Sequence, residues 1–228
     1  GLVFVKGFTD LPAYYTYKGC RVDSCSFDFP QEGIVSCAAR IVGAAEAAKV
    51  TTAPYAGYGL QYPATDPYES NLTQVVMKNY DASLTVAQLE LDANWTNPEA
   101  VCAGGRFSIA NNLDANSFVL NSYSRYSIPA GRRRIEGSLN FLFNDTTNYE
   151  DYLAGTAKRI RITFTTGTYF HKFIFPNVRY AGGRPSLGIE GEQGIRYDLP
   201  FRAIRHANTG YDVILNTRST EQVIHLTS

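Results

Sequence analysis

Apolar and polar residues alternate with a period of two along much of the chain, and this pattern limits the fold more than any other feature. In residues 20–29, Cys25, Phe27 and Phe29 share one face, while serine and aspartate residues occupy the other. The same alternation occurs in residues 107–114, 135–143, 159–165 and 195–203. Successive strand side chains point to opposite faces, so each run predicts a strand with one buried and one solvated face. Repeated this often, the pattern is typical of a mainly β fold, an antiparallel β-sandwich or barrel.

A hairpin is predicted where the turn PQEG (30–33) separates two such runs. Every second residue from Val35 to Ile41 falls on one face, which we expect to be the buried one. A register that pairs odd-numbered residues, with a three-residue loop, sets Cys25 opposite Cys37. The two could cross-link, but a disulfide there would be strained, so two packed thiols are expected. The four cysteines show neither CxxC nor metal-finger spacing, so they are expected to be reduced thiols that pack as small apolar side chains.

Residues 44–79 lack this periodicity. An Ala-rich piece is followed by prolines, glycines and tyrosines. A structureless loop of this length in a compact domain is usually functional or disordered. Because tyrosine offers a large amphipathic surface at a low entropy cost, we expect Tyr55, Tyr58, Tyr62 and Tyr68 to contact another molecule.

One short helix interrupts the strand pattern near residue 147. Thr147 and Glu150 have the spacing of a capping box, and Gly155 provides a left-handed end. The apolar face of this helix consists of Tyr149, Tyr152 and Leu153. Two turns are not stable alone, so the helix must dock on something, either an open end of the sandwich or a neighbouring subunit.

The sequence contains no recognisable catalytic or metal-binding arrangement. The three histidines are far apart in sequence and share no ligand spacing. Glu190 and Glu192 form a close carboxylate pair in a Gly-rich segment, but no base or nucleophile accompanies them. A hydrolase would need His171 or His206 near Asp198, which nothing in the sequence suggests. We therefore predict a protein that is not an enzyme and uses no cofactor or metal.

The charges give no sign of a strongly charged partner. Lys and Arg number 21 and Asp and Glu number 21, so the net charge indicates neither nucleic-acid nor acidic-membrane binding. No apolar run reaches the length of a membrane span. The one basic run, Arg132, Arg133 and Arg134, follows SIPA and is interpreted as a hairpin tip. The simplest interpretation is a solvated turn. A second is ion pairing between subunits, which the rigid guanidinium fork of Arg suits, and a third is contact with phosphate.

Five segments, in order, carry a resemblance to a known family. They are YTYKGCRVDSCSFDFPQEGIVSCAARIVG (15–43), AGGRFSIANNLD (103–114), GRRRIEGSLNFLFNDTTNYEDYLAGT (131–156), KFIFPNVRYAGGRPSL (172–187) and DLPFRAI (198–204). Over roughly residues 15–217, this order resembles the tail tube proteins of long-tailed bacteriophages. Members of that family usually carry further strands before the equivalent of residue 1. Either the chain is a fragment or it departs from the family pattern here, and loss of those strands would leave strand edges unpaired.

The resemblance implies a single β-sandwich domain over residues 1–217, with 44–79 as an inserted assembly loop and 218–228 as a tail. Subunits would join into rings, commonly hexameric, that stack with other tail proteins into a tube through which DNA is ejected. The protein would be located in the virion tail after assembly in the host cytoplasm. DNA should slide without sticking, so Arg132, Arg133 and Arg134 are expected to face a neighbouring subunit or the outside.

An alternative function remains open at this point. The same tyrosines in residues 44–79 could stack on sugars, as in a carbohydrate- or receptor-binding β-sandwich of the phage baseplate or adhesin type. Glycan binding by a stable monomer would favour this alternative. Rings or tubes that form as the concentration rises would favour the tail tube.

Overall fold

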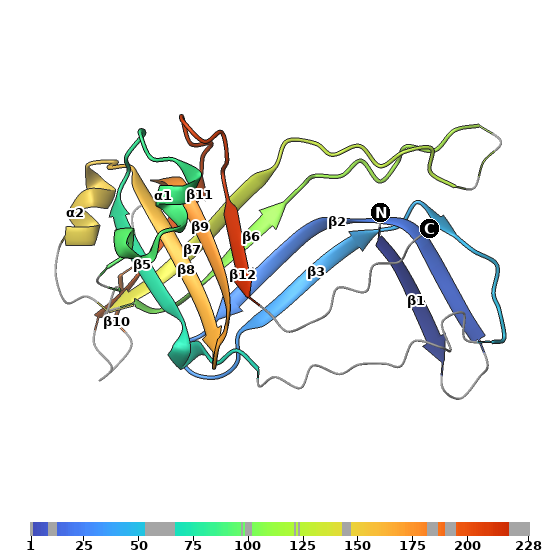
Figure 1. The fold of residues 1–228 in the computed structure, drawn as a ribbon, viewed down its shortest axis with the longest axis horizontal. Coiled ribbons are helices and arrows are strands. Elements are labelled where there is room, and N and C mark those ends of the chain that lie inside the picture. Colours follow the sequence, from blue (N-terminus) through green and yellow to red (C-terminus); the bar gives the residue numbers. More distant parts are fainter. Residues whose placement is uncertain are drawn as a thin grey trace. The chain divides into compact units, whose positions relative to one another are not determined.

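The computed structural model describes residues 2–8, 13–52, 67–96, 98, 102–120, 122, 124–142, 147–181, 187–189 and 195–218. Antiparallel strands predominate, as predicted (Figure 1). The strands are β1 (Leu2–Phe8), β2 (Ala13–Phe29), β3 (Ser36–Val42), β4 (Ala45–Glu46), β5 (Gln74–Asn79), β6 (Cys102–Ala110), β7 (Arg134–Leu142), β8 (Lys158–Thr166), β9 (Tyr169–Tyr180), β10 (Leu187–Ile189), β11 (Ile195–Ala203) and β12 (Ile214–Arg218). The helices are α1 (Val86–Glu90) and α2 (Thr147–Leu153), with 3-10 turns η1 (Ser70–Leu72) and η2 (Asp92–Asn94).

The chain divides into two compact units, each assembled from separate stretches of sequence. Unit 1 comprises Gly1–Ser26, Ala38–Tyr62 and Ile109–Arg134. Unit 2 comprises Phe27–Cys37, Pro63–Ser108 and Ile135–Ser228. The strands predicted from the alternation are therefore divided between two units that pack separately. That all of residues 1–217 act as one domain stays a prediction.

Unit 2 contains one antiparallel sheet in the order β6–β7–β11–β9–β8–β5, with β10 beside β11 and β12 beside β9. The predicted inward residues of neighbouring strands lie opposite each other, as with Tyr197 and Phe141 or Leu199 and Leu139. These four side chains are buried, which confirms the predicted faces of β7 and β11.

Aromatic rings on one face of this sheet form the main core of unit 2. Phe107 of β6 lies 4.9 Å from Phe27 and 5.0 Å from Phe173 of β9, measured between ring centroids. Strands β7 and β11 separate β6 from β9 in the hydrogen-bonded order. The sheet must therefore fold over on itself for these rings to meet. Sandwich-like packing is thus achieved within a single sheet.

The opposite face of β5, β8 and β9 is covered by α1 (Figure 1) and by η2, neither of which the sequence predicted. The cluster on this face consists of Val76, Leu89, Trp95, Ile174 and Ile214. Helix α1 begins with a capping box, in which Thr85 and Gln88 bond each other's backbone N–H groups. The prediction of a structureless loop over 44–79 was wrong at both ends, at the start because of β4 and at the end because of β5. The alternation was missed there because Val75, Val76 and Met77 are all buried.

Because α1 and η2 cover β8, the prediction that one face of this strand is solvated was wrong. Arg161 and Thr163 were expected to be solvated, yet each is only 6% exposed. The guanidinium groups of Arg159 and Arg161 lie 5.0 and 5.4 Å from the centroid of Trp95. A polar face can thus be buried when its cationic side chains make cation–π contacts with an aromatic ring and ion pairs with carboxylates.

Helix α2 forms where predicted, but its contacts differ. Thr147 is its first helical residue rather than its cap, and Gly155 has the expected positive φ of 64°. Leu153 is 62% exposed, whereas Asn148 is buried, so the predicted apolar face is only partly used. Tyr152 packs 5.8 Å from Tyr180 of β9, which docks the helix on unit 2.

Unit 1 contains a ladder of β1 and β2, with β4 also paired to β2. Gly7 is opposite Tyr14, and a Cβ at Gly7 would lie 2.7 Å from the Tyr14 ring. The glycine therefore lets this ring lie against the backbone of β1.

Strand β3 corrects a further prediction. Cys37, Ala39 and Ile41 were expected to be buried, but all three are exposed, while Val42 of the opposite parity is buried. Of the four cysteines, Cys20 is the buried one and Cys37 is exposed.

Candidate assembly surface

Unit 1 buries few apolar side chains. The described residues include 25 buried hydrophobic side chains, and four of these belong to unit 1: Ala13, Cys20, Val42 and Ile128. None of the four is aromatic. Unit 1 comprises about a third of the chain, so it holds far less than its share of the core.

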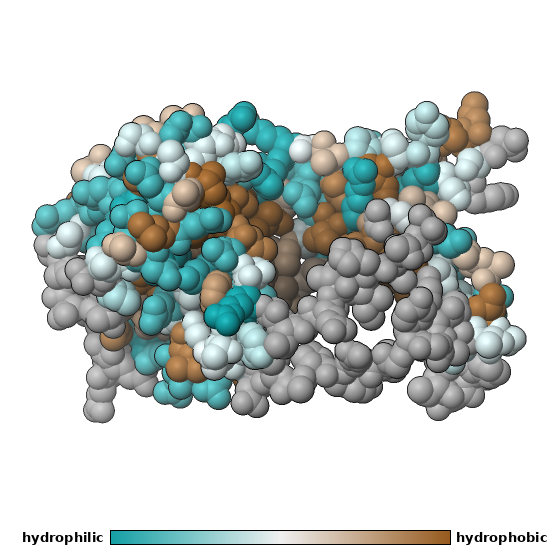
Figure 2. Space-filling view, in the orientation of Figure 1, coloured by the Kyte–Doolittle hydropathy of each residue, from teal (hydrophilic) through white to brown (hydrophobic). Residues whose placement is uncertain are grey.

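The same unit exposes large apolar side chains. On β1 they are Leu2, Val3, Phe4 and Val5, and farther along the chain they are Ile41, Val50, Phe118, Val119, Leu120 and Tyr126. Leu120 is 99% exposed and Tyr126 is 81% exposed. Figure 2 shows hydrophobic surface at the upper right, where Figure 1 places the long excursion between β6 and β7. An exposed apolar surface of this extent is typical of an interaction site.

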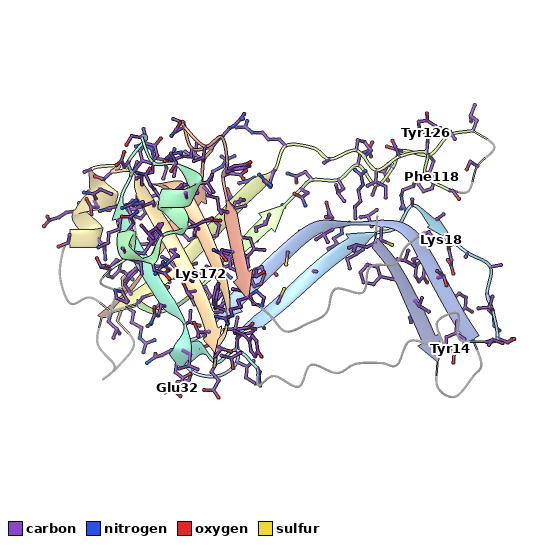
Figure 3. The ribbon with its side chains drawn as sticks, viewed as in Figure 1. Tyr14, Lys18, Glu32, Phe118, Tyr126 and Lys172 are labelled. Carbon is purple, nitrogen blue, oxygen red and sulfur yellow. The ribbon has the colours of Figure 1, made fainter. Side chains whose placement is uncertain are left out.

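This excursion forms a hairpin-like arm, comprising residues 113–120, 122 and 124–130. Backbone bridges join Leu113 to Ala130 and Phe118 to Arg125. Figure 3 shows Phe118 and Tyr126 on the arm. At its base, Asn112 has a positive φ of 48°, a conformation that Asn tolerates better than most residues, and donates to the Arg132 carbonyl at 2.6 Å.

Arg125 fixes the arm to the rest of unit 1. Its guanidinium donates hydrogen bonds to the carbonyl oxygens of Ala115 and Gly43. The backbone N–H of Arg125 also donates to the Ala44 carbonyl at 3.0 Å. Its guanidinium lies 4.9 Å from the centroid of Phe118. One side chain thus joins the two sides of the arm to the segment before β4.

A cleft of about 570 Å³ lies beside this joint. Its lining consists of Phe4, Tyr17, Cys20, Ile41, Gly43, Ala44, Ala45, Glu46, Phe118 and Arg125, all from unit 1. The walls combine apolar side chains with Glu46 and with the Arg125 guanidinium, which is occupied by backbone carbonyls. We call this feature the arm cleft.

The predicted contact residues are distributed over both units. Tyr55, Tyr58 and Tyr62 lie outside the described residues. Tyr68 is half-buried in unit 2, with its ring 4.9 Å from that of His171. Tyr149 and Tyr152, also of unit 2, are half-buried on α2. Their roles in assembly stay predictions.

The basic run is exposed, but it is not the hairpin tip that was predicted. Arg132, Arg133 and Arg134 follow the arm at its base, and β7 begins at Arg134. The tip lies instead between Phe118 and Arg125. Phe118, Val119 and Leu120 were not among the residues predicted to make contacts. An apolar triplet between uncharged polar residues, without a strand-like alternation, was the signal that could have found them.

Unit 2 contains an ion cluster around Asp92. Its carboxylate accepts from Arg161 at 2.7 Å and from Lys172 at 2.8 and 2.9 Å. The hydrogen bond from Lys172 is the largest cause that lowers the pKa of Asp92, and both cations add to it. Burial lowers the pKa of Arg161, against the attraction of Asp92. This cluster joins η2 to β8 and β9 and needs no ligand to explain it.

His206 and Asp198, which a hydrolase would have needed close together, each bond to other groups of the fold. The buried ring of His206 donates from Nε2 to the Asp81 carbonyl at 2.9 Å and accepts the Thr209 N–H at Nδ1. Asp198 accepts from Asn140 at 3.0 Å. Among the described residues, no group of three or more His, Cys, Asp or Glu residues could hold a metal ion. No helix in the described part of the chain is long and apolar enough to cross a membrane.

Comparison with known proteins gives one result. The model of a family described as phage tail tube protein matches residues 2–203, which is most of the chain. No curated protein matches the chain.

Proposed function

The chain belongs to the phage tail tube protein family, and we propose that copies of it join into rings that stack to form the tube of a phage tail. Membership, which the sequence resemblance predicted, makes the protein a structural component of the virion tail. In the proposed assembly the rings are hexameric and enclose a channel for DNA ejection. Assembly takes place in the host cytoplasm, with other tail proteins at the ends of the tube.

The observation that carries this proposal is the apolar surface of unit 1. A segment with few buried apolar side chains gains little from folding alone, because ordering each residue costs about 1–2 kcal/mol. Burial of its exposed side chains against a second copy would offset that cost. Unit 1 exposes Phe4, Phe118, Leu120 and Tyr126. This arrangement suits a protein that is completed by its neighbours.

Charge supports passage of DNA through such a tube. The chain has 21 basic and 21 acidic residues, so it carries no excess positive charge that would hold phosphates. The one basic run, Arg132 to Arg134, is exposed on unit 1. We propose that it faces a neighbouring subunit or the outside of the tube. If charge reversal at these three positions leaves tubes intact and ejection unchanged, the intersubunit placement is wrong.

The remaining predicted contacts belong to this proposal as well. Tyr55, Tyr58, Tyr62 and Tyr68 would contact an adjacent ring, and Tyr149 and Tyr152 of α2 would face a neighbouring subunit. A partly exposed tyrosine can make such contacts without a large loss of conformational entropy.

Electron micrographs of the purified protein over a concentration series test the proposal. We expect particles to change from monomers to rings and tubes as the concentration rises, with a matching increase in sedimentation coefficient. A monomer that persists at the highest soluble concentration and binds glycans on an array would contradict it. That outcome would favour the carbohydrate-binding alternative.

A further inference from the structure

The arm cleft and the tip of the arm have complementary chemistry. The cleft offers apolar walls from Phe4, Tyr17 and Ile41, and the tip presents Val119 and Leu120 to solvent. We propose that the cleft of one copy receives Val119 and Leu120 of the next copy, an inference that rests on the proposed self-assembly.

The tip is suited to enter an apolar site. Val119 is 47% exposed and Leu120 is 99% exposed, so Leu120 makes almost no use of its hydrophobic surface within the chain. No charged residue occurs between Asp114 and Arg125. The tip itself therefore carries no charge that would have to leave water on insertion, which would cost several kcal/mol.

The cleft is suited to receive it. Its volume of about 570 Å³ falls within the roughly 300–1,000 Å³ typical of binding sites. Arg125 holds Phe118 in place through its contacts with Gly43, Ala44 and Ala115, so one wall is preformed. Buried Cys20 also lines the site, together with the charged residues Glu46 and Arg125. A preformed wall reduces the entropy cost of binding.

A second copy is the occupant that best fits these observations. Each chain carries one tip and one cleft, so the contact is heterologous: the tip of one copy meets the cleft of another. Such contacts continue from copy to copy and produce closed rings or open filaments. The net charge of zero also avoids mutual repulsion between identical chains.

Substitution of the tip provides the first test. In Leu120→Asp a charge replaces an exposed side chain, so the thermal midpoint of the dilute protein should not change. We expect the dissociation constant for self-association to rise about 10- to 100-fold, as expected from loss of one buried leucine. Leu215→Asp is the matched control, because Leu215 is also exposed but belongs to unit 2. It should assemble as the unchanged protein does.

A mixing experiment tests the direction of the contact. Ile41→Asp damages the cleft and Leu120→Asp damages the tip. In an equimolar mixture, one intact tip meets one intact cleft, so pairs should form while longer assemblies do not. Assembly of Leu120→Asp alone to the same extent as the unchanged protein would overturn the proposal.

Disulfide trapping tests proximity directly. In a background with exposed Cys37 replaced by Ser, Leu120→Cys protein is mixed with Ile41→Cys protein and oxidised. We expect a covalent dimer from this pair and none from Leu215→Cys with Ile41→Cys. If tubes form but the Leu120 and Ile41 variants give no covalent dimer, the tip-in-cleft contact is wrong while the tube function stands. If the unchanged protein never self-associates, both proposals fail.

Discussion

The two units of this protein differ in how much of their apolar surface they bury. Unit 2 buries phenylalanine rings on one face of its sheet and a tryptophan cluster on the other. Unit 1 has a ladder of strands and a well-bonded arm, yet it leaves Phe4, Phe118 and Leu120 exposed. Backbone hydrogen bonds are therefore present in both units, whereas a hydrophobic core is present mainly in one. The comparison shows that strand pairing alone does not provide a core.

The largest expected difference comes from removing one ring in each unit. Phe107→Ala removes a buried side chain from unit 2 and should lower the free energy of unfolding by about 3–5 kcal/mol. Phe118→Ala in unit 1 removes a ring that is 52% exposed, so the expected loss in the dilute protein is below about 1 kcal/mol. Denaturant unfolding below the association threshold measures both. Equal losses would show that unit 1 has a core of its own.

A smaller loss is expected from overpacking unit 2. A Cβ at Gly137 would lie 2.5 Å from the Phe201 ring and 2.6 Å from the Arg106 carbonyl oxygen. Gly137→Ala should therefore lower the free energy of unfolding by about 1–3 kcal/mol. Gly155→Ala is a useful control, because nothing lies near that Cβ and the strain comes only from its positive φ. If Gly137→Ala is no more destabilising than the control, the packing between β7 and β11 is looser than the structure indicates.

The ion cluster of unit 2 predicts a dependence on pH. The pKa of Asp92 is lowered in the folded protein, so its contribution is present above the unfolded value near 3.8 and is lost as the pH falls through the folded value. Asp92→Asn should lower the free energy of unfolding by about 1–2 kcal/mol at neutral pH. This loss is smaller than that for a buried ion pair, because the carboxylate is partly exposed. The variant should also lose less stability on acidification below about pH 4. Glu90→Gln in neighbouring α1 is the control, and an unchanged acid profile in Asp92→Asn would contradict this assignment.

The smallest expected effect on global stability concerns the arm. Arg125→Lys keeps the charge but loses the planar fork that bonds Gly43 and Ala115. We expect a change below about 1 kcal/mol in unfolding, together with faster chymotryptic cleavage after exposed Tyr126. Arg205→Lys, which loses a bond to the Gly210 carbonyl in unit 2, should leave cleavage at Tyr126 unchanged. Equal cleavage rates in both variants would mean that Arg125 does not hold the arm.

The sequence predicted most of what periodicity can encode. Strands with one buried face, such as β7 and β11, were located because Leu139, Phe141, Tyr197 and Leu199 alternate with polar residues. Strand β5 was missed because it is buried on both faces, and the cover over Arg161 was missed because α1 has only five residues. Short helices and doubly buried strands carry little periodic signal.

The candidate site was less predictable for a different reason. The prediction of a buried face on β3 was wrong, because alternation shows which residues share a face but not whether anything covers that face. Ile41 is therefore exposed within a regular strand. The apolar residues at the tip of the arm belong to no periodic element, and their placement depends on Arg125 contacts with residues about 80 positions earlier. Such long-range contacts are not visible in local sequence.

Hydrogen exchange read by mass spectrometry, on dilute and on assembled protein, tests most directly whether unit 1 depends on neighbouring copies while unit 2 does not. The account predicts that peptides from residues 13–26 and 109–120 exchange quickly in the dilute protein and become protected on assembly. Peptides from residues 158–180 should be protected in both samples. Strong protection of the unit 1 peptides in the dilute monomer, with no change on assembly, would contradict it.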